Sequence, residues 1–309
     1  MEEQVGLISA VVELIGAIIG IIAAVGISIQ FKINWISIVC IIISGILIIA
    51  LIRLFKKFER IKKDTGLLNR QIAKCEQKLY YSMENSYKKN NGYKTMNHIA
   101  LEGLKRYVSL VANVLSIYTN KKVTVSIRFF EEEEEVNNSK LKILEFSENC
   151  DSEREYLFRD KEKSIKTVKY NTDFKNIIGE DRTESVNYFY EPDLNKLHKK
   201  LSKTSGKGYE NETPNRESYY NSRIVVPIST NNSNLFYKKE KSGNDIKGFL
   251  CADSKKENTF PNNKIKKFFY IYLMETYASK LYIILNKYAY YLSNISKGVI
   301  HDEEGHRIN

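Results

Sequence analysis

Hydrophobic positions divide the chain into an apolar N-terminal segment and a longer segment in which apolar and polar positions alternate. Residues 5–29 and 35–52 form two apolar runs, separated by the short stretch Gln-Phe-Lys-Ile-Asn. The second run has 18 consecutive uncharged residues, enough for about 27 Å of helix. We therefore predict a two-helix transmembrane hairpin over residues 1–55, with both of its ends on the same side of the membrane.

Basic residues set the orientation of this hairpin. The second run is followed by six of them with only Glu59 between: Arg53, Lys56, Lys57, Arg60, Lys62 and Lys63. Such clusters stay in the cytoplasm and attract anionic lipid, at about 1 kcal/mol per residue. We expect a multi-pass protein of the inner (cytoplasmic) membrane, with both termini and the rest of the chain in the cytoplasm and membrane lipid as a partner. Four cysteines without a CxxC pair agree with a reducing compartment.

Glu13 is the one charged residue inside the first apolar run. Glu13 and Arg53 are each 20 residues from Ile33, the centre of the turn. We expect both at the cytoplasmic membrane interface; the alternative is a functional carboxylate inside the bilayer. Gly16, Gly20 and Ala24 form a small-residue face with a GxxxG match, which lets helices approach closely. That face packs either within the hairpin or between chains.

Apolar positions continue beyond the hairpin at heptad spacing. The seam consists of Leu54, Phe58, Ile61, Thr65, Leu68, Ile72, Cys75 and Leu79. It predicts a helical stalk over residues 56–91 and favours a parallel coiled coil, so we expect a homo-oligomer, a dimer or larger. The alternative is an amphipathic helix that packs on its own domain.

Helix and strand patterns alternate over residues 92–294. They predict a helix at 92–118, strands at 121–130 and 141–146, short helices at 171–179 and 191–203, strands at 222–229 and 246–254, and a helix from 262 to about 292. Asp193 is the expected cap of the second short helix. This order predicts an α+β fold, an antiparallel sheet with the first and last helices adjacent on one face and the polar region 147–221 on the other. Residues 295–309 are predicted to be a flexible tail.

Charge and motif content exclude several functions. The net charge is +11, but 48 basic and 37 acidic residues are interspersed, which does not predict a nucleic-acid partner. The four histidines lack metal-ligand spacing, and the chain has no P-loop, GxSxG or GxGxxG motif. We expect neither an enzyme nor a protein with a cofactor or metal.

Two strand motifs resemble a known family. Ser222, Ile224 and Val226-Pro227-Ile228 are followed by Ile246, Gly248, Leu250 and Asp253, and then by a long terminal helix. This pattern resembles the second half of a GAF domain, over about residues 94–292 and most strongly over 218–254. The resemblance implies a GAF-like sensory fold with a ligand pocket between the sheet and the short helices of residues 173–220.

The resemblance also indicates residues that would line the pocket. They are Arg128, Phe174, Asn187, Tyr188, Phe189, Tyr219 and Arg223. The two arginines could bind a phosphate or carboxylate through their planar guanidinium groups; the alternative is that each is an ordinary surface arginine. The Asn-Lys-Phe-Asp-Glu set for cyclic nucleotides is absent, as is a chromophore-binding cysteine, which argues against cGMP and bilins.

Three functions are compatible with this organisation. The first is a membrane-anchored sensor that binds a small ligand, with nucleotide second messengers as one candidate class, and signals through the stalk. The second is a membrane-disrupting effector of bacterial anti-phage defence, whose hairpin oligomerises when a ligand binds. The third is a structural anchor whose domain binds only protein.

Overall fold

A computed structural model describes residue 16 and residues 35–89, 92–130, 140–159, 166–178, 188–213, 215–229, 246–296, 300–301 and 307–308. The contacts divide the chain into two units, Met1–Lys63 and Asp64–Asn309. Several predictions lie outside the described residues: the first apolar run except Gly16, and with it Glu13, Gly20 and Ala24, and the pocket residue Asn187.

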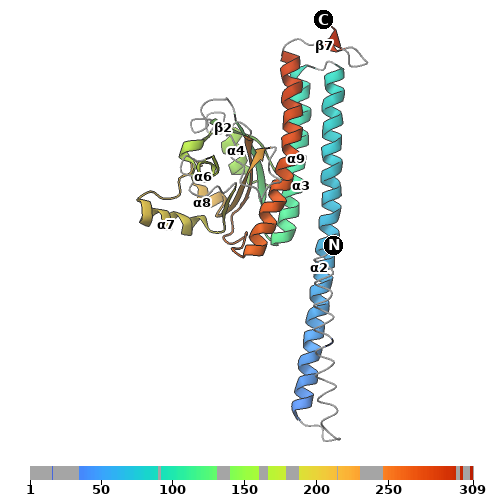
Figure 1. Cartoon of the computed structure of the whole chain (residues 1–309), viewed down its shortest axis with the longest axis vertical. Coiled ribbons are helices and arrows are strands. Elements are labelled where there is room, and N and C mark those ends of the chain that lie inside the picture. The colour runs from blue at the N-terminus through green and yellow to red at the C-terminus, as the bar shows by residue number, and fades with distance from the viewer. Residues whose placement is uncertain are drawn as a thin grey trace. The chain divides into compact units, whose positions relative to one another are not determined.

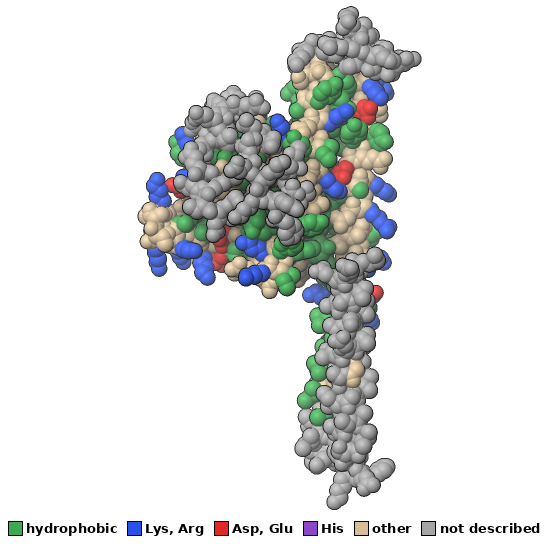
Figure 2. Space-filling model, in the orientation of Figure 1, with side chains coloured by type: hydrophobic (Ala, Val, Ile, Leu, Met, Phe, Trp, Pro, Cys, Tyr) green, Lys and Arg blue, Asp and Glu red, His purple; other side chains and the backbone are tan. Residues whose placement is uncertain are grey.

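The second apolar run is helical, as predicted. It forms the start of α2 (Trp35–Lys88). The described apolar side chains here lie on the surface (Figure 2): Ile43, Ile46, Leu47, Ile48, Ile49, Ile52, Leu54, Phe55 and Phe58. Among the side chains that the structure describes, no helical stretch has both the length and the hydropathy that crossing a membrane requires.

The small-residue face of the first apolar run is described at one position. Gly16 is helical, and a Cβ added there would meet no atom within 4 Å. Close packing along the GxxxG face therefore stays a prediction.

The second unit contains an antiparallel sheet, as the sequence predicts. Its described strands are ordered β3-β2-β1-β6-β5-β4. Their bounds are Thr124–Phe130 (β1), Lys140–Phe146 (β2), Lys166–Thr167 (β3), Phe189–Glu191 (β4), Ser222–Ser229 (β5) and Ile246–Ser254 (β6). With the flanking helices, this sheet makes the fold α+β. A separate two-stranded pair, β7 (Ile300–His301) and β8 (Arg307–Ile308), follows near the C-terminus.

The first and last helices of this unit lie side by side against one face of the sheet (Figure 1), as predicted. They are α3 (Tyr93–Thr119) and α9 (Lys264–Ser296). Alternate strand residues point to this face because side chains alternate along a strand. Val125, Ile127 and Ile224 join the core that α3 and α9 cover, whereas Val225 and Cys251 belong to a second core on the other face.

Short helices cover that second core. They are α4 (Ser152–Arg159), η1 (Val168–Tyr170), α6 (Thr172–Ile178), α7 (Leu194–Ser205) and α8 (Arg216–Tyr219). Phe174 and Ile177 of α6 and Leu194 of α7 are buried against the sheet side chains. The predicted cap is confirmed, since the Asp193 side chain accepts a hydrogen bond from the Lys196 backbone N–H at 2.9 Å.

The heptad seam changes environment at the boundary between the units. From Thr65 to Leu79 the described α2 seam positions are buried or partly buried in the core shared with α3 and α9. The Tyr277 hydroxyl of α9 donates to Asn69 at 2.7 Å, and Lys280 pairs with Glu76 at 3.0 Å. Packing on its own domain therefore accounts for this half of the seam. Leu54 and Phe58 are exposed in the single chain, and a coiled coil through them stays a prediction.

Candidate functional site: a buried ladder of arginines and aromatic rings

Three arginines are buried on the sheet face opposite α3 and α9. They are Arg128 of β1, Arg154 of α4 and Arg223 of β5, with side chains no more than about 2% exposed. Strand alternation explains two of them, because the neighbours Ile127 and Ile224 point into the α3–α9 core. The alternative that Arg128 and Arg223 are ordinary surface arginines is therefore wrong.

Two buried aspartates lie beside these arginines. Asp253 of β6 is the direct strand partner of Arg223, and its Oδ2 accepts a hydrogen bond from the terminal nitrogen of Arg154 at 2.5 Å. The Nε of Arg223 lies 2.9 Å from Asp173 Oδ2 and 3.4 Å from Asp253 Oδ1. Strand register thus places Arg223 of β5 beside Asp253 of β6, and Asp173 of α6 supplies the second carboxylate.

These contacts keep the cluster charged. Burial lowers the pKa of Arg223, but the attraction of Asp173 and Asp253 outweighs it and raises this pKa well above its usual value. Burial raises the pKa of Asp253, but Arg223 and Arg154 outweigh it and lower this pKa below 3.8. Both groups are therefore ionised near neutral pH.

Aromatic rings alternate with the guanidinium groups. The Tyr220 ring lies between Arg154 and Arg223, with both guanidinium carbons 4.8 Å from its centroid. The Phe174 ring lies 5.5 Å from the guanidinium carbons of both Arg223 and Arg128. We call this series of five residues, Arg154–Tyr220–Arg223–Phe174–Arg128, the arginine ladder. Cation–π contacts of this kind stabilise each arginine where water is excluded.

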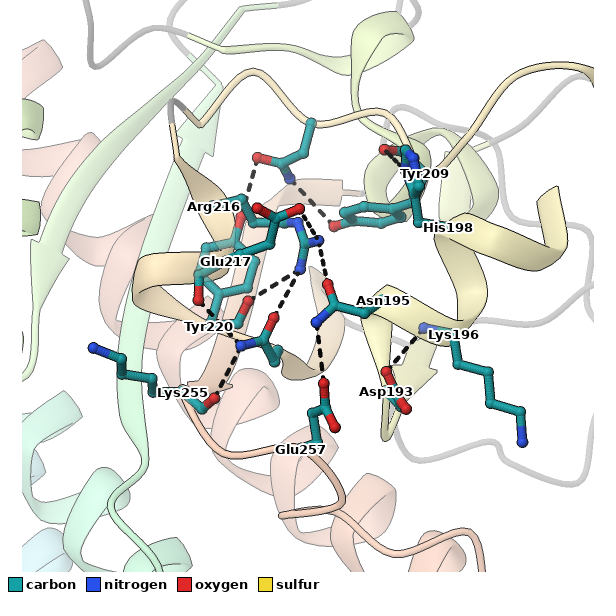
Figure 3. Close-up of polar contacts among 12 residues, drawn as sticks. Asp193, Asn195, Lys196, His198, Tyr209, Arg216, Glu217, Tyr220, Lys255 and Glu257 are labelled. Carbon is teal, nitrogen blue, oxygen red and sulfur yellow. Dashed lines mark hydrogen bonds and ion pairs between the residues drawn. The ribbon is translucent and has the colours of Figure 1, made fainter. Parts of the chain in front are cut away.

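A polar network around Arg216 holds Tyr220 in place (Figure 3). One terminal nitrogen of Arg216 donates to the Tyr220 carbonyl at 3.2 Å, and the other donates to Asn195 Oδ1 at 2.9 Å. The Tyr220 hydroxyl donates to Asn211 Oδ1 at 3.0 Å. The network connects α7 to α8, and Asn211, which lies between these helices, holds the hydroxyl of the ring between the two arginines.

Arg223 has several unsatisfied polar atoms. Its side chain is fully buried, and none of its three guanidinium nitrogens has a hydrogen-bond acceptor among the described residues. The contacts with the aspartates have ion-pair distances without hydrogen-bond geometry. A buried donor left without an acceptor costs about 1–3 kcal/mol. Arg223 therefore has unused capacity to bind an anion.

The structure brings only some of the predicted pocket residues together. Arg128, Phe174 and Arg223 belong to the ladder, and Phe189 is buried in the apolar cluster around it. Tyr188 instead packs with the α3–α9 core, where Lys267 lies 5.4 Å from its ring.

Tyr219 lines a separate cavity that also includes Arg154 in its wall. Arg154, Asp173 and Tyr220 were not predicted individually. Strand register could have indicated that Arg223 lies beside Asp253, which is next to the last residue of the adjacent strand β6. Nothing in the local sequence of α4 distinguishes Arg154 from surface arginines.

In the described part of the chain, no three His, Cys, Asp or Glu residues are grouped so that they could hold a metal ion.

Comparisons with known proteins do not establish a family. No family model matches the chain. No curated protein matches it either.

Solved structures with some likeness include two GAF domains of phosphoenolpyruvate-protein phosphotransferases. The one from Coxiella burnetii is 12% identical and has a TM-score of 0.36, with 71% of this chain and 96% of that chain covered. The one from Acinetobacter is 12% identical, with a TM-score of 0.34 and coverage of 69% and 92%. A type II free methionine-R-sulfoxide reductase from Thermoplasma acidophilum is 15% identical, with a TM-score of 0.34 and coverage of 58% and 92%.

Proposed function

We propose that the chain is a membrane-anchored, GAF-like sensor that binds a small anionic ligand at the arginine ladder. The observation that carries the proposal is Arg223, a fully buried guanidinium without a hydrogen-bond acceptor among the described residues. The strand motifs around Pro227 and Gly248 and the order of helices and strands support the GAF-like interpretation.

The chemistry of the ladder favours a phosphate or carboxylate ligand. A guanidinium binds either group through two parallel hydrogen bonds. The aspartates Asp173 and Asp253 contact Arg223 through Nε, which leaves its two terminal nitrogens for the ligand. Nucleotide second messengers carry such phosphates and are our first candidate class.

Burial of the ladder supports a sensory function. A ligand reaches Arg223 only if the residues that cover it, such as Phe174 and Tyr220, move. A ligand shifts a protein between two states when it binds one of them more tightly. Because α9 packs on β5 and also contacts α2, a movement at the ladder has a physical route to the stalk.

The membrane anchor in this proposal is supported by the sequence. The uncharged run at residues 35–52 is long enough to span, and the six basic residues after it favour a cytoplasmic position. We further propose that the protein lies in the inner membrane as a homo-oligomer and has no catalytic activity.

The test is a ligand screen on the full-length protein in detergent micelles, with thermal unfolding followed by circular dichroism. The panel contains cyclic mononucleotides, cyclic dinucleotides, nucleoside triphosphates and small carboxylates. A ligand at 100 times its dissociation constant should stabilise the folded state by about 2.7 kcal/mol. A panel in which no compound raises the midpoint would contradict the proposal.

Arg223→Lys is the diagnostic variant. It keeps a positive charge beside the two aspartates but removes the planar guanidinium, so the ligand-induced shift should be lost. Lys199→Gln, on the exposed side of α7, is the control and should keep the shift. Equal shifts in both variants would place the ligand elsewhere.

A membrane-disrupting effector is the second candidate. Exposed apolar side chains along residues 43–58 of α2 favour it, because they would contact lipid or another copy of the helix. Expression in bacteria with a membrane-potential dye separates the two functions. An effector should depolarise the cells when the stabilising ligand is supplied, whereas a sensor should leave the potential unchanged at equal protein levels.

A further inference from the structure

A small cavity lies at the ends of β1 and β6, beside α4 and α8. Its volume is about 230 Å³, far more than the roughly 10–15 Å³ that one water molecule requires. The wall is formed by Lys122, Thr124, Asp151, Arg154, Ser218, Tyr219, Ser254, Lys255 and Lys256. A phosphate group with a small organic substituent has about this size.

The wall is rich in cations. Three of its lysines are exposed, namely Lys122, Lys255 and Lys256, so their charges are free to turn toward a solute. The hydroxyl groups of Thr124, Ser218 and Tyr219 add neutral hydrogen-bond donors. Asp151 is the one carboxylate of the wall, and one of its oxygens accepts a hydrogen bond from the Glu153 backbone N–H at 3.0 Å.

A buried and incompletely satisfied group is part of the same wall. Arg154 is about 1% exposed, and its terminal nitrogen is bonded to Asp253. Its Nε has no hydrogen-bond partner among the described residues. An exposed lysine cluster alone is explained by solvation, but a buried guanidinium N–H without an acceptor is costly, and an anion in the cavity that Arg154 lines could supply that acceptor.

We propose that this cavity is a second anion site, specific for a phosphate group. Lys122, Lys255 and Lys256 supply most of the charge, and the hydroxyl groups and Arg154 complete the ring of donors. The site is distinct from the terminal nitrogens of Arg223 and does not depend on a ligand there. The carboxylate of Asp151 repels an anion in the cavity. Removing its charge should therefore strengthen binding, whereas removing the lysine charges should weaken it.

Titration with inorganic phosphate and with pyrophosphate tests the site. The full-length protein in detergent micelles is followed by isothermal calorimetry, with sodium chloride keeping the ionic strength constant. Lys122→Gln/Lys255→Gln/Lys256→Gln should weaken pyrophosphate binding at least about tenfold, because charge-assisted hydrogen bonds are lost. Asp151→Asn should strengthen binding, since asparagine still caps the helix while the repulsive charge is gone.

A matched control removes the same charge elsewhere. Lys199→Gln/Lys200→Gln/Lys203→Gln lies on the exposed surface of α7, where Figure 2 shows a group of basic side chains. This variant should keep wild-type affinity. Equal losses in the two triple variants, or no binding of either anion by the wild-type protein, would overturn the proposal.

The source of the phosphate is decided by a pair of related compounds. Glycerol 3-phosphate and dihexanoyl phosphatidic acid present similar phosphate groups, but only the second has acyl chains. Tighter binding of the lipid, abolished by the cavity triple variant, would identify a lipid headgroup as the ligand. Equal affinity for both would identify a soluble phosphate compound. Binding of the lipid alone, unaffected by that variant, would count against the site.

Discussion

Arg223 and Asp253 have opposite charges at directly paired positions of β5 and β6. Together with Asp173 and Arg154 they form a charged group inside an otherwise apolar cluster. Buried ion pairs gain little net stability over apolar residues of the same size, because desolvation offsets their attraction. Folding stability alone therefore does not account for this charged group, which agrees with the ligand site proposed above.

Asp253→Asn should destabilise the protein in a pH-dependent manner. At pH 7 the variant leaves Arg154 and Arg223 short of a carboxylate, which we expect to cost about 3–5 kcal/mol. The folded-state pKa of Asp253 lies below its unfolded value of 3.8. Its ionised form therefore contributes stability above pH 3.8, and this contribution is lost as the pH falls through the folded pKa.

Urea unfolding of the wild type and the variant at pH 7, 5, 4 and 3 measures this difference. The gap between the two proteins should be constant from pH 7 to 5 and should shrink at the lowest pH values. Asp64→Asn, at an exposed position of α2, should change stability by no more than about 0.5 kcal/mol at any pH. A gap that stays constant down to pH 3 would mean that Asp253 is not held ionised by the arginines.

The ladder also shows what sequence can indicate about single residues. Strand alternation and the Ile-x-Gly motif place Arg223 and Asp253, so half of the charged cluster was accessible from the pattern. Arg154 and Asp173 come from short helices in a polar region, where no periodicity separates buried from exposed positions. Burial of these two residues depends on tertiary contacts that the local sequence does not encode.

At the scale of elements, the long periodic helices and the four main strands were predictable because each has one apolar face. The helix predicted at residues 92–118 is observed at Tyr93–Thr119, and the strands at 222–229 and 246–254 are observed with the same bounds. The elements β3, β4 and α8 have four residues or fewer, which is too few positions for a period to be detected. The helix α4 has eight residues, but most of them are polar or charged, so it shows no clear apolar face.

Gly103 of α3 tests how α2 packs on the second unit. A Cβ at Gly103 would collide with the side chain of the buried Leu79 of α2. Gly103→Ala should therefore lower stability by about 1–3 kcal/mol from overpacking, although alanine favours a helix by about 1 kcal/mol. Thermal unfolding of the full-length protein measures the change.

Two further variants isolate the cause. Gly66→Ala, in α2, adds a Cβ that meets no atom within 4 Å, so it should stabilise the protein by up to about 1 kcal/mol. In a Leu79→Ala background the collision is removed, and Gly103→Ala should become neutral or stabilising. A loss of stability that persists in that background would argue against this contact.

At the scale of the whole molecule, α2 links the two units through one helix of 54 residues. An apolar segment of this helix is followed by a basic one. Residues 35–52 are uncharged, and six basic residues lie between 53 and 63. Composition alone predicts this change from apolar to basic residues. It does not predict which residues each apolar face packs against. The same heptad pattern includes exposed residues before Lys63 and buried residues after it.

The membrane topology that we propose can be measured directly. A hairpin with the basic cluster in the cytoplasm puts the N-terminus, the second unit and the C-terminus on the cytoplasmic side. Green fluorescent protein fused to either end should therefore fluoresce in bacteria, and alkaline phosphatase fused to either end should be inactive. Replacing Arg53 and the five lysines and arginines after it with glutamine should lower the fraction of molecules in this orientation. Phosphatase activity at one end alone would indicate a single span, and the predicted placement of Glu13 and Arg53 at the same interface would then be wrong.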